Sequence, residues 1–456
     1  YGYKYSQSSW DNTNANGSSW YGPYSKNVRV YSCQGFEMSN CYLQGSGIEI
    51  GTREGTSEVA DESELRILNN TGISSVFTET QPLKYAALDL HVKNNVFDSL
   101  VERIKYVNIS AQNDYFSANK SNRIIIDGNR FYNASGSSVT DVAIYMRNIL
   151  GDNNANSSNE LWVFKNNYVK YEGANTSTLA YFSHVDTIIN NTFIHTNNTI
   201  VELEEERNNS IAPYPTFFVN NYITAYGNGT TKAMYIDNTL DPGSVIAHNS
   251  INQLGTGSAT GLYFEQSADD ITVKNNIFSC TGGGIPLQVD GSLTNIDWDY
   301  NCYHTTGNVL AFYNGSTYSD VNSLGVAMSS DANSIEENPY YVSDEDYTIN
   351  NSLLKAGVTI ASVSNDIDGA LRSSPPTMGV KEFVFCNNDA GIGSVVSPVA
   401  PLSSNTNDIT VQLNNNGSNS LSAVSIAWSV NGVLQTPYSW SGSLASQASS
   451  DVTIAS

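Results

Sequence analysis

Residues 273–278 read VKNNIF, which is the end of an alternating apolar run, an Asn pair and then an apolar pair. The same pattern returns as HVKNNVF (91–97), VFKNNYV (163–169), IINNTFI (188–194) and FVNNYI (218–223). A short unit that returns along a chain predicts a solenoid, because each unit can bury its apolar side chains only by stacking on its neighbours.

The last Asn before each apolar pair serves as the anchor of a unit. Successive anchors from residue 70 onwards are 24 to 38 residues apart, so loops of differing length are inserted into a constant unit. Asn tolerates the left-handed backbone of a sharp corner, and its amide can bond the equivalent Asn one coil away. We therefore predict a stacked Asn ladder with a scaffold role. Its members are Asn70, Asn95, Asn129, Asn167, Asn191, Asn221, Asn249, Asn276 and Asn301, and Asn40 extends the series backwards.

Composition supports short strands over long helices. The chain of 456 residues contains 56 Asn and 34 Gly, which are poor helix formers, and only 14% of its residues are charged. A second apolar run follows most anchors after a polar turn, as in IPLQV at 285–289. Each unit thus holds two or three short strands, and we predict an all-β fold.

These units resemble coils of the right-handed parallel β-helix family, which includes pectate-lyase-like proteins and many bacterial surface proteins. The resemblance covers residues 27–385, and the Tyr-rich residues 1–26 are expected to form an N-terminal cap or to continue a longer chain. The ending of the helix, NDIDGALR at 365–372 and MGVKEF at 378–383, resembles the helix end in secreted bacterial members. The residues in the family's pattern are Asp366, Asp368, Gly369, Arg372, Gly379 and Glu382.

Residues 386–456 differ in pattern from the repeat. DITVQLNNNG (408–417) and VSIAWSVNG (424–432) alternate apolar and polar residues around Asn-Gly turns, which predicts a β-sandwich. The segment resembles the cell-adhesion-related (CARDB-type), immunoglobulin-like domains of bacterial surface proteins. A complete sandwich needs roughly 100 residues, so we expect an incomplete domain and a natural polypeptide that continues. The resemblance further implies export by the type IX pathway.

Charge and hydropathy limit the partners. The net charge of −23 would repel a nucleic-acid backbone, and no apolar run approaches the ~20 residues of a membrane span. We expect an extracellular or cell-surface location, with surface glycans, extracellular proteins or other domains of the same chain as partners.

The cysteines leave two interpretations open. Cys33 with Cys41, and Cys280 with Cys302, could each form a disulfide, or they could be buried free thiols. Cys386 has no obvious partner.

Two triplets resemble the O-glycosylation motif of bacteria that use the type IX pathway. They are Asp98-Ser99-Leu100 and Asp186-Thr187-Ile188. Ser99 and Thr187 are therefore candidate modification sites, with ordinary turns as the alternative.

No complete catalytic constellation is present in the sequence. The β-helix lyases and hydrolases need paired carboxylates, or a base beside a calcium-bridged uronate. Asp269-Asp270 resembles one element of polygalacturonase-type sites, but the other elements of those sites are missing. The acidic cluster Glu202, Glu204, Glu205 and Glu206 predicts a solvated loop, with a cation or ligand site as the alternative. Asp366 and Asp368 resemble part of a calcium loop, with a turn at the helix cap as the alternative, and no other cofactor is expected.

The leading hypothesis is a segment of a large secreted bacterial cell-surface protein. It would be an adhesin or a surface filament, including one used in gliding, and it would act as a rigid stalk or binding scaffold. The alternatives are a β-helix polysaccharide lyase or hydrolase and a non-catalytic glycan-binding protein.

Overall fold

The chain divides into two compact units, Tyr1–Glu382 and Phe383–Ser456. The first ends three residues before the predicted boundary at 385/386, because the carboxylate of Glu382 is buried within it. The computed structural model describes residues 28–31, 36–51, 63–78, 88–97, 107–112, 123–133, 143–149, 161–172, 178–195, 199–204, 215–238, 240–399 and 407–456. The predicted N-terminal cap at 1–26 lies outside the described residues.

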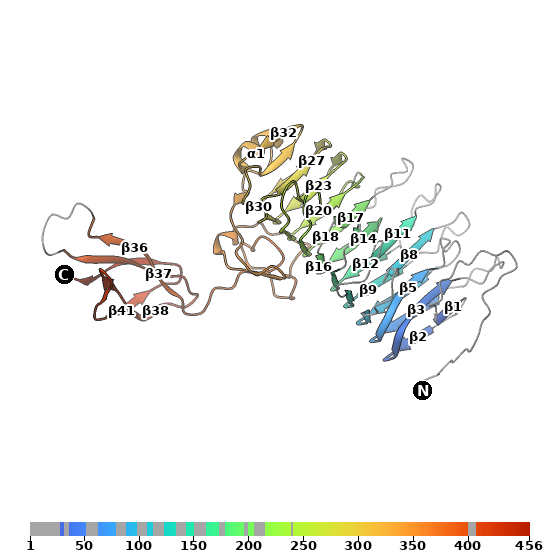
Figure 1. Cartoon of the computed structure of the whole chain (residues 1–456), viewed down its shortest axis with the longest axis horizontal. Coiled ribbons are helices and arrows are strands. Elements are labelled where there is room, and N and C mark those ends of the chain that lie inside the picture. The colour runs from blue at the N-terminus through green and yellow to red at the C-terminus, as the bar shows by residue number, and fades with distance from the viewer. Residues whose placement is uncertain are drawn as a thin grey trace. The chain divides into compact units, whose positions relative to one another are not determined.

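The first unit is a solenoid of parallel strands that resembles a β-helix. One coil contributes β12 (Leu161–Lys165), β13 (Tyr168–Tyr171) and β14 (Thr178–Ser183), and the next contributes β15 (Thr187–Ile189), β16 (Thr192–His195) and β17 (Thr199–Glu204). Equivalent strands pair in parallel from coil to coil, as β12 does with β15, β13 with β16 and β14 with β17. Figure 1 shows the strands of successive coils lying side by side. The solenoid therefore has three faces.

Face A is the sheet of strands that precede the anchors, face B holds the strands that follow them, and face C holds the third strand of each coil. Face A contains β2 (Phe36–Ser39), β4 (Ser63–Leu68), β6 (Leu88–Lys93), β9 (Arg123–Asp127), β12, β15, β18 (Phe217–Val219), β21 (Val245–Ala247), β25 (Thr272–Lys274) and β29 (Asp297–Asp299). Face B contains β7 (Val96–Phe97), β10 (Arg130–Asn133), β13, β16, β19 (Tyr222–Ala225), β22 (Ser250–Gln253), β26 (Ile277–Cys280), β30 (Cys302–Thr305) and β33 (Ile335–Glu336). Face C contains β1 (Val28–Tyr31), β8 (Val107–Gln112), β11 (Ile144–Ile149), β14, β17, β20 (Lys232–Ile236), β23 (Thr260–Phe264), β27 (Ile285–Val289) and β31 (Ala311–Tyr313).

Two long strands join faces B and C into one sheet. β3 (Tyr42–Gly51) and β5 (Thr71–Thr78) continue around the corner between these faces. Thr71 of β5 pairs with Val96 on face B, whereas Val76 pairs with Val107 on face C. A shorter parallel pair, β24 (Ala268–Asp269) and β28 (Leu293–Thr294), adds a fourth side to two later coils.

Inward side chains stack in apolar rows along the solenoid. On face A one such row is in strand register, and none of its members is more than 1% exposed. Burying each of these side chains contributes roughly 1.5–3 kcal/mol, which offsets the cost of ordering the short strands. The row consists of Ile67, Val92, Ile126, Phe164, Ile188, Phe218, Ile246, Val273 and Trp298.

The anchor residues form a continuous buried ladder at the corner between faces A and B. Asn191 is typical: its backbone N–H and its Nδ2 both donate to Oδ1 of Asn221, at 3.0 and 2.9 Å, and its Nδ2 also donates to the carbonyl of Phe164. The same three bonds recur from Asn70 to Asn276, and at Asn301 the backbone N–H donates to Oγ of Ser334 instead. Every ladder amide is therefore fully hydrogen-bonded away from water.

The sequence predicts that each anchor Asn has the left-handed backbone of the corner. This prediction is wrong, because the left-handed residue is the one before each anchor. These residues have φ between 54° and 67°: Asn40, Asn69, Asn94, Gly128, Asn166, Asn190, Asn220, His248, Asn275 and Tyr300. These left-handed residues are here called the outer row of the corner. Asn40 belongs to the outer row, so its assignment as an anchor is wrong. Cys41 holds the ladder position of that coil, and its backbone N–H donates to Oδ1 of Asn70 at 2.9 Å.

A helix and a polar network close the solenoid after its last coil. The chain passes through the hairpin of β31 and β32 (Ser316–Tyr318) into α1 (Val321–Met328), whose first turn is capped by Asp320. Ser334, which ends the Asn ladder, donates to the buried carboxylate of Asp331. Asp331 also accepts from the hydroxyl of Tyr303 at 2.6 Å.

Residues 337–382, here called the strap, then run back along face B and across the corner onto face A, where Ile360 and Val363 pack on Val219 and Ala247. The strap contains β34 (Tyr341–Ser343), β35 (Asp346–Ile349) and the short helix η1 (Ser352–Leu354). The hydroxyl of Tyr222 donates to the carbonyl of Asp344 at 2.8 Å, and Nζ of Lys170 lies 2.9 Å from Oε1 of Glu345. The strap thus reaches coils more than 100 residues earlier in the sequence.

The second unit consists of antiparallel strands. One sheet has the order β36 (Ala390–Ser397), β37 (Ile409–Asn415), β42 (Ser449–Ala455), and β38 (Leu421–Ile426) pairs with β41 (Tyr438–Leu444). Both sheets contribute to one small core that includes Leu413, Ile426 and Leu444. The hairpin of β39 (Ser429–Val430) and β40 (Val433–Leu434) turns at Asn431-Gly432, where both residues have positive φ, as the Asn-Gly signal predicts. No helix in the described part of the chain is long and apolar enough to span a membrane.

Replacing an Asn of the ladder should lower the stability of the fold. Asn221→Ala leaves two donors of Asn191 without their acceptor and the carbonyl of Ile188 without its donor. We expect the free energy of unfolding, measured by urea denaturation, to fall by about 3–5 kcal/mol. The exposed Asn322 in α1 is the control, and Asn322→Ala should change it by less than about 0.5 kcal/mol. Equal effects of the two substitutions would contradict the role of the ladder.

Asp331 should make stability depend on pH. Burial raises its pKa to about 6, although Ser334 and Tyr303 donate to it. Between about pH 4 and pH 6 the unfolded chain ionises this carboxyl before the folded chain does, so the contribution of Asp331 to stability is largest below that range and falls by about 2–3 kcal/mol across it. The melting temperature of Asp331→Asn should therefore fall less with pH over this range than that of the parent. Asp297, whose side chain is 61% exposed, is the control, and Asp297→Asn should show the pH dependence of the parent. An unchanged pH slope in Asp331→Asn would contradict the assignment.

Candidate functional site

Face C carries a row of aromatic and polar side chains between its buried rows. Strand register places the members of this tyrosine row opposite one another, one per coil. The rings of Tyr145 and Tyr181 stack with centroids 4.8 Å apart, and those of Tyr235 and Tyr263 with centroids 5.5 Å apart. The row consists of Tyr145, Tyr181, Glu202, Tyr235, Tyr263 and Gln288.

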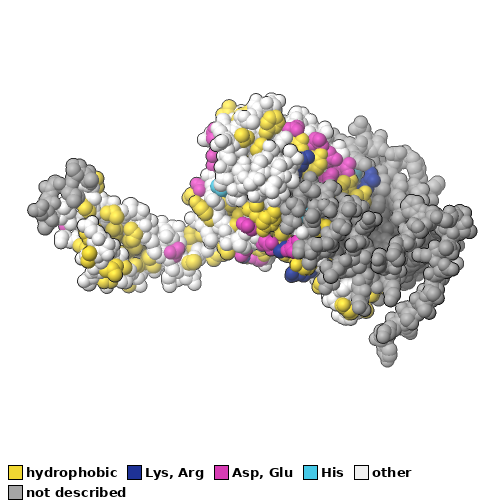
Figure 2. All heavy atoms as spheres, viewed as in Figure 1, with side chains coloured by type: hydrophobic (Ala, Val, Ile, Leu, Met, Phe, Trp, Pro, Cys, Tyr) yellow, Lys and Arg dark blue, Asp and Glu magenta, His cyan; other side chains and the backbone are white. Residues whose placement is uncertain are grey.

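Carboxylates form a second row two residues further along the same strands. This acidic row consists of Glu204, Asp237, Glu265 and Asp290, and Figure 2 shows acidic side chains gathered over this part of face C. Like charges one strand apart, ~4.8 Å, repel one another unless donors or cations lie between them. The carboxylates of the acidic row therefore need hydrogen-bond donors or cations beside them.

The tyrosine row supplies some of those donors. The hydroxyl of Tyr235 contacts both Asp237, at 2.8 Å, and Glu265, while the hydroxyl of Tyr263 donates to Asp290 at 2.6 Å. Burial and the neighbouring carboxylates raise the pKa of both tyrosines, so their hydroxyls stay protonated and able to donate. Gln288 also donates to Asp290 and Asn238 to Glu204, at 3.1 and 3.2 Å, and a carboxylate oxygen can accept more than one donor.

A lysine lies over the two stacked rings. Nζ of Lys232 is 3.6 Å from the centroid of Tyr235 and 4.2 Å from that of Tyr263, which is close enough for cation–π attraction. Burial lowers the pKa of Lys232, against the opposing effect of Glu265 and Asp237. Burial also raises the pKa of Glu202, which accepts a hydrogen bond from Thr178 at 2.9 Å. Face C thus presents carboxylates, hydroxyls, an ammonium group and aromatic rings together.

The sequence identified only part of this face. Glu202 and Glu204 were expected in a solvated loop, but they lie on β17, and Glu205 and Glu206 lie outside the described residues. The tyrosines were missed because loops of differing length hide which of them share a register. A usable signal did exist, since VAIYM, TLAYF, AMYI and GLYF each carry a Tyr just before the last apolar residue.

The other predicted site residues do not join face C. Thr187 lies half-buried on β15 of face A, and Ser99 lies outside the described residues. Asp269 accepts from Thr294 and from Nδ2 of Asn295, at 2.5 and 2.9 Å, whereas Asp270 is a left-handed corner residue with φ of 52°. The adjacent Asp pair is therefore part of a corner.

The cysteines of the described coils are free thiols. Register pairs Cys280 with Thr305, and Cys302 with Ile277, so the two thiols are offset along neighbouring strands and form no disulfide with each other. Burial raises the pKa of the Cys302 thiol to about 12, and that of Cys280 is raised as well. Cys41 is also free, and Cys33 lies outside the described residues. The free-thiol interpretation is the one found.

The helix-ending motif builds a buried cluster that fastens the strap. Arg372 and Glu382 are 5% and 7% exposed and lie 3.1 Å apart, and Arg372 also donates to Oδ1 of Asn220 at 2.6 Å. Burial alone would raise the pKa of Glu382, but donors from Ser373, Thr377 and Arg372 outweigh it and the pKa is lowered. The cluster therefore ties the strap to the outer row of the corner.

The two aspartates of the motif are engaged within the strap. Asp366 accepts three backbone N–H groups, from Asp368, Ala370 and Glu382, at 2.8 to 3.0 Å. Asp368 pairs with Lys381 at 3.0 Å and accepts from the hydroxyl of Tyr347. These contacts are those of a turn, the alternative to the calcium interpretation. Gly369 and Gly379 supply the positive φ of 83° and 87° that the turns require.

Comparison of the chain with protein-family models, with curated proteins and with solved structures gives no match. The side chains of face C are therefore the main indication of function.

Breaking the buried ion pair should loosen the strap. Arg372→Ala leaves the carboxylate of Glu382 buried without its main counter-charge, and we expect the free energy of unfolding to fall by about 3–5 kcal/mol. Asp368→Asn is the control, because Asp368 is 41% exposed and its ion pair is worth at most about 1 kcal/mol. Urea denaturation of both variants checks this. A loss below about 1 kcal/mol in Arg372→Ala would contradict the fastening role.

Proposed function

We propose that this chain is a segment of a large secreted bacterial cell-surface protein that binds glycans. In this proposal the solenoid is a rigid, right-handed scaffold, face C is the binding surface, and the second unit is an immunoglobulin-like, adhesion-type module. The observation that carries the proposal is the pairing of the tyrosine row with the acidic row across successive coils.

The chemistry of face C suits a polyhydroxylated ligand. Carboxylate oxygens accept hydrogen bonds from sugar hydroxyls, and hydrogen bonds to charged groups are each worth roughly 1.5–3 kcal/mol. Aromatic side chains add apolar contact area beside these acceptors. Because the groups repeat once per coil, a ligand that itself repeats can contact several coils at once.

Charge narrows the class of glycan. Four carboxylates lie in the acidic row, and the chain as a whole carries a net charge of −23. Polymers of uronic acids would be repelled by both. Neutral glycans or glycans with free amino groups fit the face better.

The architecture supports the scaffold part of the proposal. The Asn ladder and the apolar rows run through the coils without interruption, so the coils form one stacked body and do not hinge at a break in the core. Crossover connections between parallel strands are right-handed in nearly all proteins, which supports the expected hand. Two antiparallel sheets around one core support the adhesion-type module.

A hydrolase is the second candidate, and one contact favours it. The hydroxyl of Tyr235 touches both Asp237 and Glu265, so two carboxyl groups share a single proton donor. Glycoside hydrolysis uses two carboxyl groups of this kind, one as acid and one as base or nucleophile. Release of product from a bound glycan would select this alternative.

Binding to a glycan array, followed by titration of the best neutral or amino-sugar ligand, tests the proposal. Glu265→Gln keeps the shape of the side chain but removes its charge, and we expect roughly 10-fold weaker binding or more. Asp297→Asn on face A is the control and should bind like the parent.

Three results would count against glycan binding by face C. They are equal binding by Glu265→Gln and the parent, preference for uronic-acid polymers, and no binding to any glycan. Product formation that Glu265→Gln abolishes would replace the binding role with hydrolysis.

A further inference from the structure

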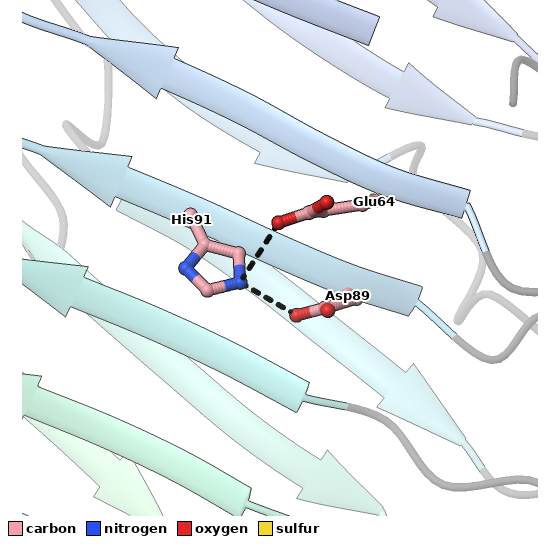
Figure 3. Close-up of side chains that lie close together, drawn as sticks. All are labelled: Glu64, Asp89 and His91. Atoms are coloured by element: carbon pink, nitrogen blue, oxygen red, sulfur yellow. Dashed lines mark ion pairs between the residues drawn. The ribbon is translucent and has the colours of Figure 1, made fainter. Parts of the chain in front are cut away.

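Face A carries a separate cluster of side chains that the proposed glycan face does not use. Glu64 on β4 lies opposite Asp89 on β6 in the strand register, and His91 lies two residues after Asp89 on the same outward side. Nε2 of His91 is 2.8 Å from Oδ1 of Asp89 and 3.9 Å from Oε1 of Glu64. Figure 3 shows the imidazole ring between the two carboxylates, with both ion pairs dashed. The three side chains converge on one point above the sheet.

Two of the converging atoms are buried and have no hydrogen-bond partner among the described residues. These atoms are Nε2 of His91 and Oδ1 of Asp89, and only 12% of the His91 side chain is exposed. The two atoms face each other as an ion pair, and neither has a hydrogen-bond partner besides. A buried polar atom without a hydrogen bond costs about 1–3 kcal/mol, and a bound cation would give both atoms a partner.

We propose that Glu64, Asp89 and His91 form a binding site for a divalent transition-metal ion. Nitrogen and carboxylate ligands bind zinc at about 2.0–2.2 Å, so two ligands of one ion lie at most ~4.4 Å apart. The candidate ligand atoms all lie within 4.8 Å of one another, and both distances from His91 are below that limit. An imidazole with two carboxylates suits zinc or manganese, whereas calcium prefers oxygen ligands alone.

Neighbouring arginines hold the carboxylates in place. Nη2 of Arg66 is 2.6 Å from Oε1 of Glu64, and Nη1 of Arg123 is 4.0 Å from Oδ2 of Asp89. Nε of Arg66 also donates to the same Oε1, at 2.8 Å, which fixes the direction of this carboxylate. Carboxylate ligands in metal sites are commonly hydrogen-bonded in this way. Three protein ligands leave coordination positions open for water or for an outside ligand.

The competing explanation is a network of ion pairs only. In that case a protonated His91 would neutralise Asp89, and Arg66 would neutralise Glu64, with no metal bound. The two explanations predict different results for the same titration, because an ion-pair network does not bind zinc with a defined stoichiometry.

Isothermal titration of the full chain with Zn²⁺, in excess Mg²⁺ to occupy adventitious acidic sites, tests the proposal. We expect one zinc ion per chain, and affinity at least about 10-fold weaker in His91→Gln and in Asp89→Asn. The controls His304→Gln on face B and Asp297→Asn on face A should bind as the parent does. Zinc should also raise the melting temperature of the parent but not that of His91→Gln.

The absorption spectrum of the parent with Co²⁺ gives a readout that does not depend on any variant folding. Nitrogen coordination should appear as visible bands that excess Zn²⁺ removes. Unchanged zinc binding in His91→Gln and Asp89→Asn, no binding at all, or a Co²⁺ spectrum of oxygen ligands alone would each overturn the site. None of these outcomes bears on glycan binding by face C, so the two proposals can fail separately.

Discussion

The asparagine ladder is the constraint on which the rest of the first unit depends. Each buried amide uses both its donors and its acceptor on neighbouring coils, so a shift of one coil by one residue would leave several polar groups unpaired inside the protein. The ladder therefore fixes the register of every strand that follows it. Loops between strands can differ in length because none of them sets that register.

The surfaces follow from this fixed register. Tyr235 meets Tyr263, and Glu64 meets Asp89, only because equivalent positions of successive coils are held opposite each other. The strap depends on it in the same way, since Arg372 reaches Asn220 in the outer row of the corner. Side chains far apart in sequence thus become neighbours through one repeated backbone arrangement.

Much of the solenoid could be read from the sequence, and the errors have physical causes. Nine of the ten anchors chosen from the pattern lie in the ladder, because an Asn followed by an apolar pair marks the corner directly. The position of Asn40 was mistaken because its coil has a single Asn, and the sequence does not show which of the two corner positions that Asn occupies. In an Asn pair the two residues have different roles. The first bends the backbone, a task that Gly128, His248 and Tyr300 also perform, whereas the second supplies the buried amide.

The candidate sites were harder to predict than the fold. The distance in sequence between Asp237 and Glu265, or between Glu64 and Asp89, is set by loops whose lengths carry no information about register. The motif that ends the strap was found in the sequence, but the contacts of the strap with earlier coils were not, since Lys170 and Glu345 are 175 residues apart. A local sequence pattern identifies the repeated corner of each coil, but it gives no information on contacts that occur only once, such as those of the strap.

The uniform direction of the ladder bonds gives the solenoid an electrical polarity. Each anchor accepts through Oδ1 from the preceding coil and donates its backbone N–H and one Nδ2 hydrogen to the next, while its other Nδ2 hydrogen bonds a carbonyl of the preceding coil. All the amides have this same orientation, so their dipoles add along the axis instead of cancelling. The oxygen end lies at Asn70, where the backbone of Cys41 donates to it, and the N–H end is met by Ser334 and the carboxyl of Asp331. In the bonds between neighbouring amides, one end of the row thus accepts and the other donates. Two such solenoids could continue one row of amides across a junction only head to tail, in the same direction.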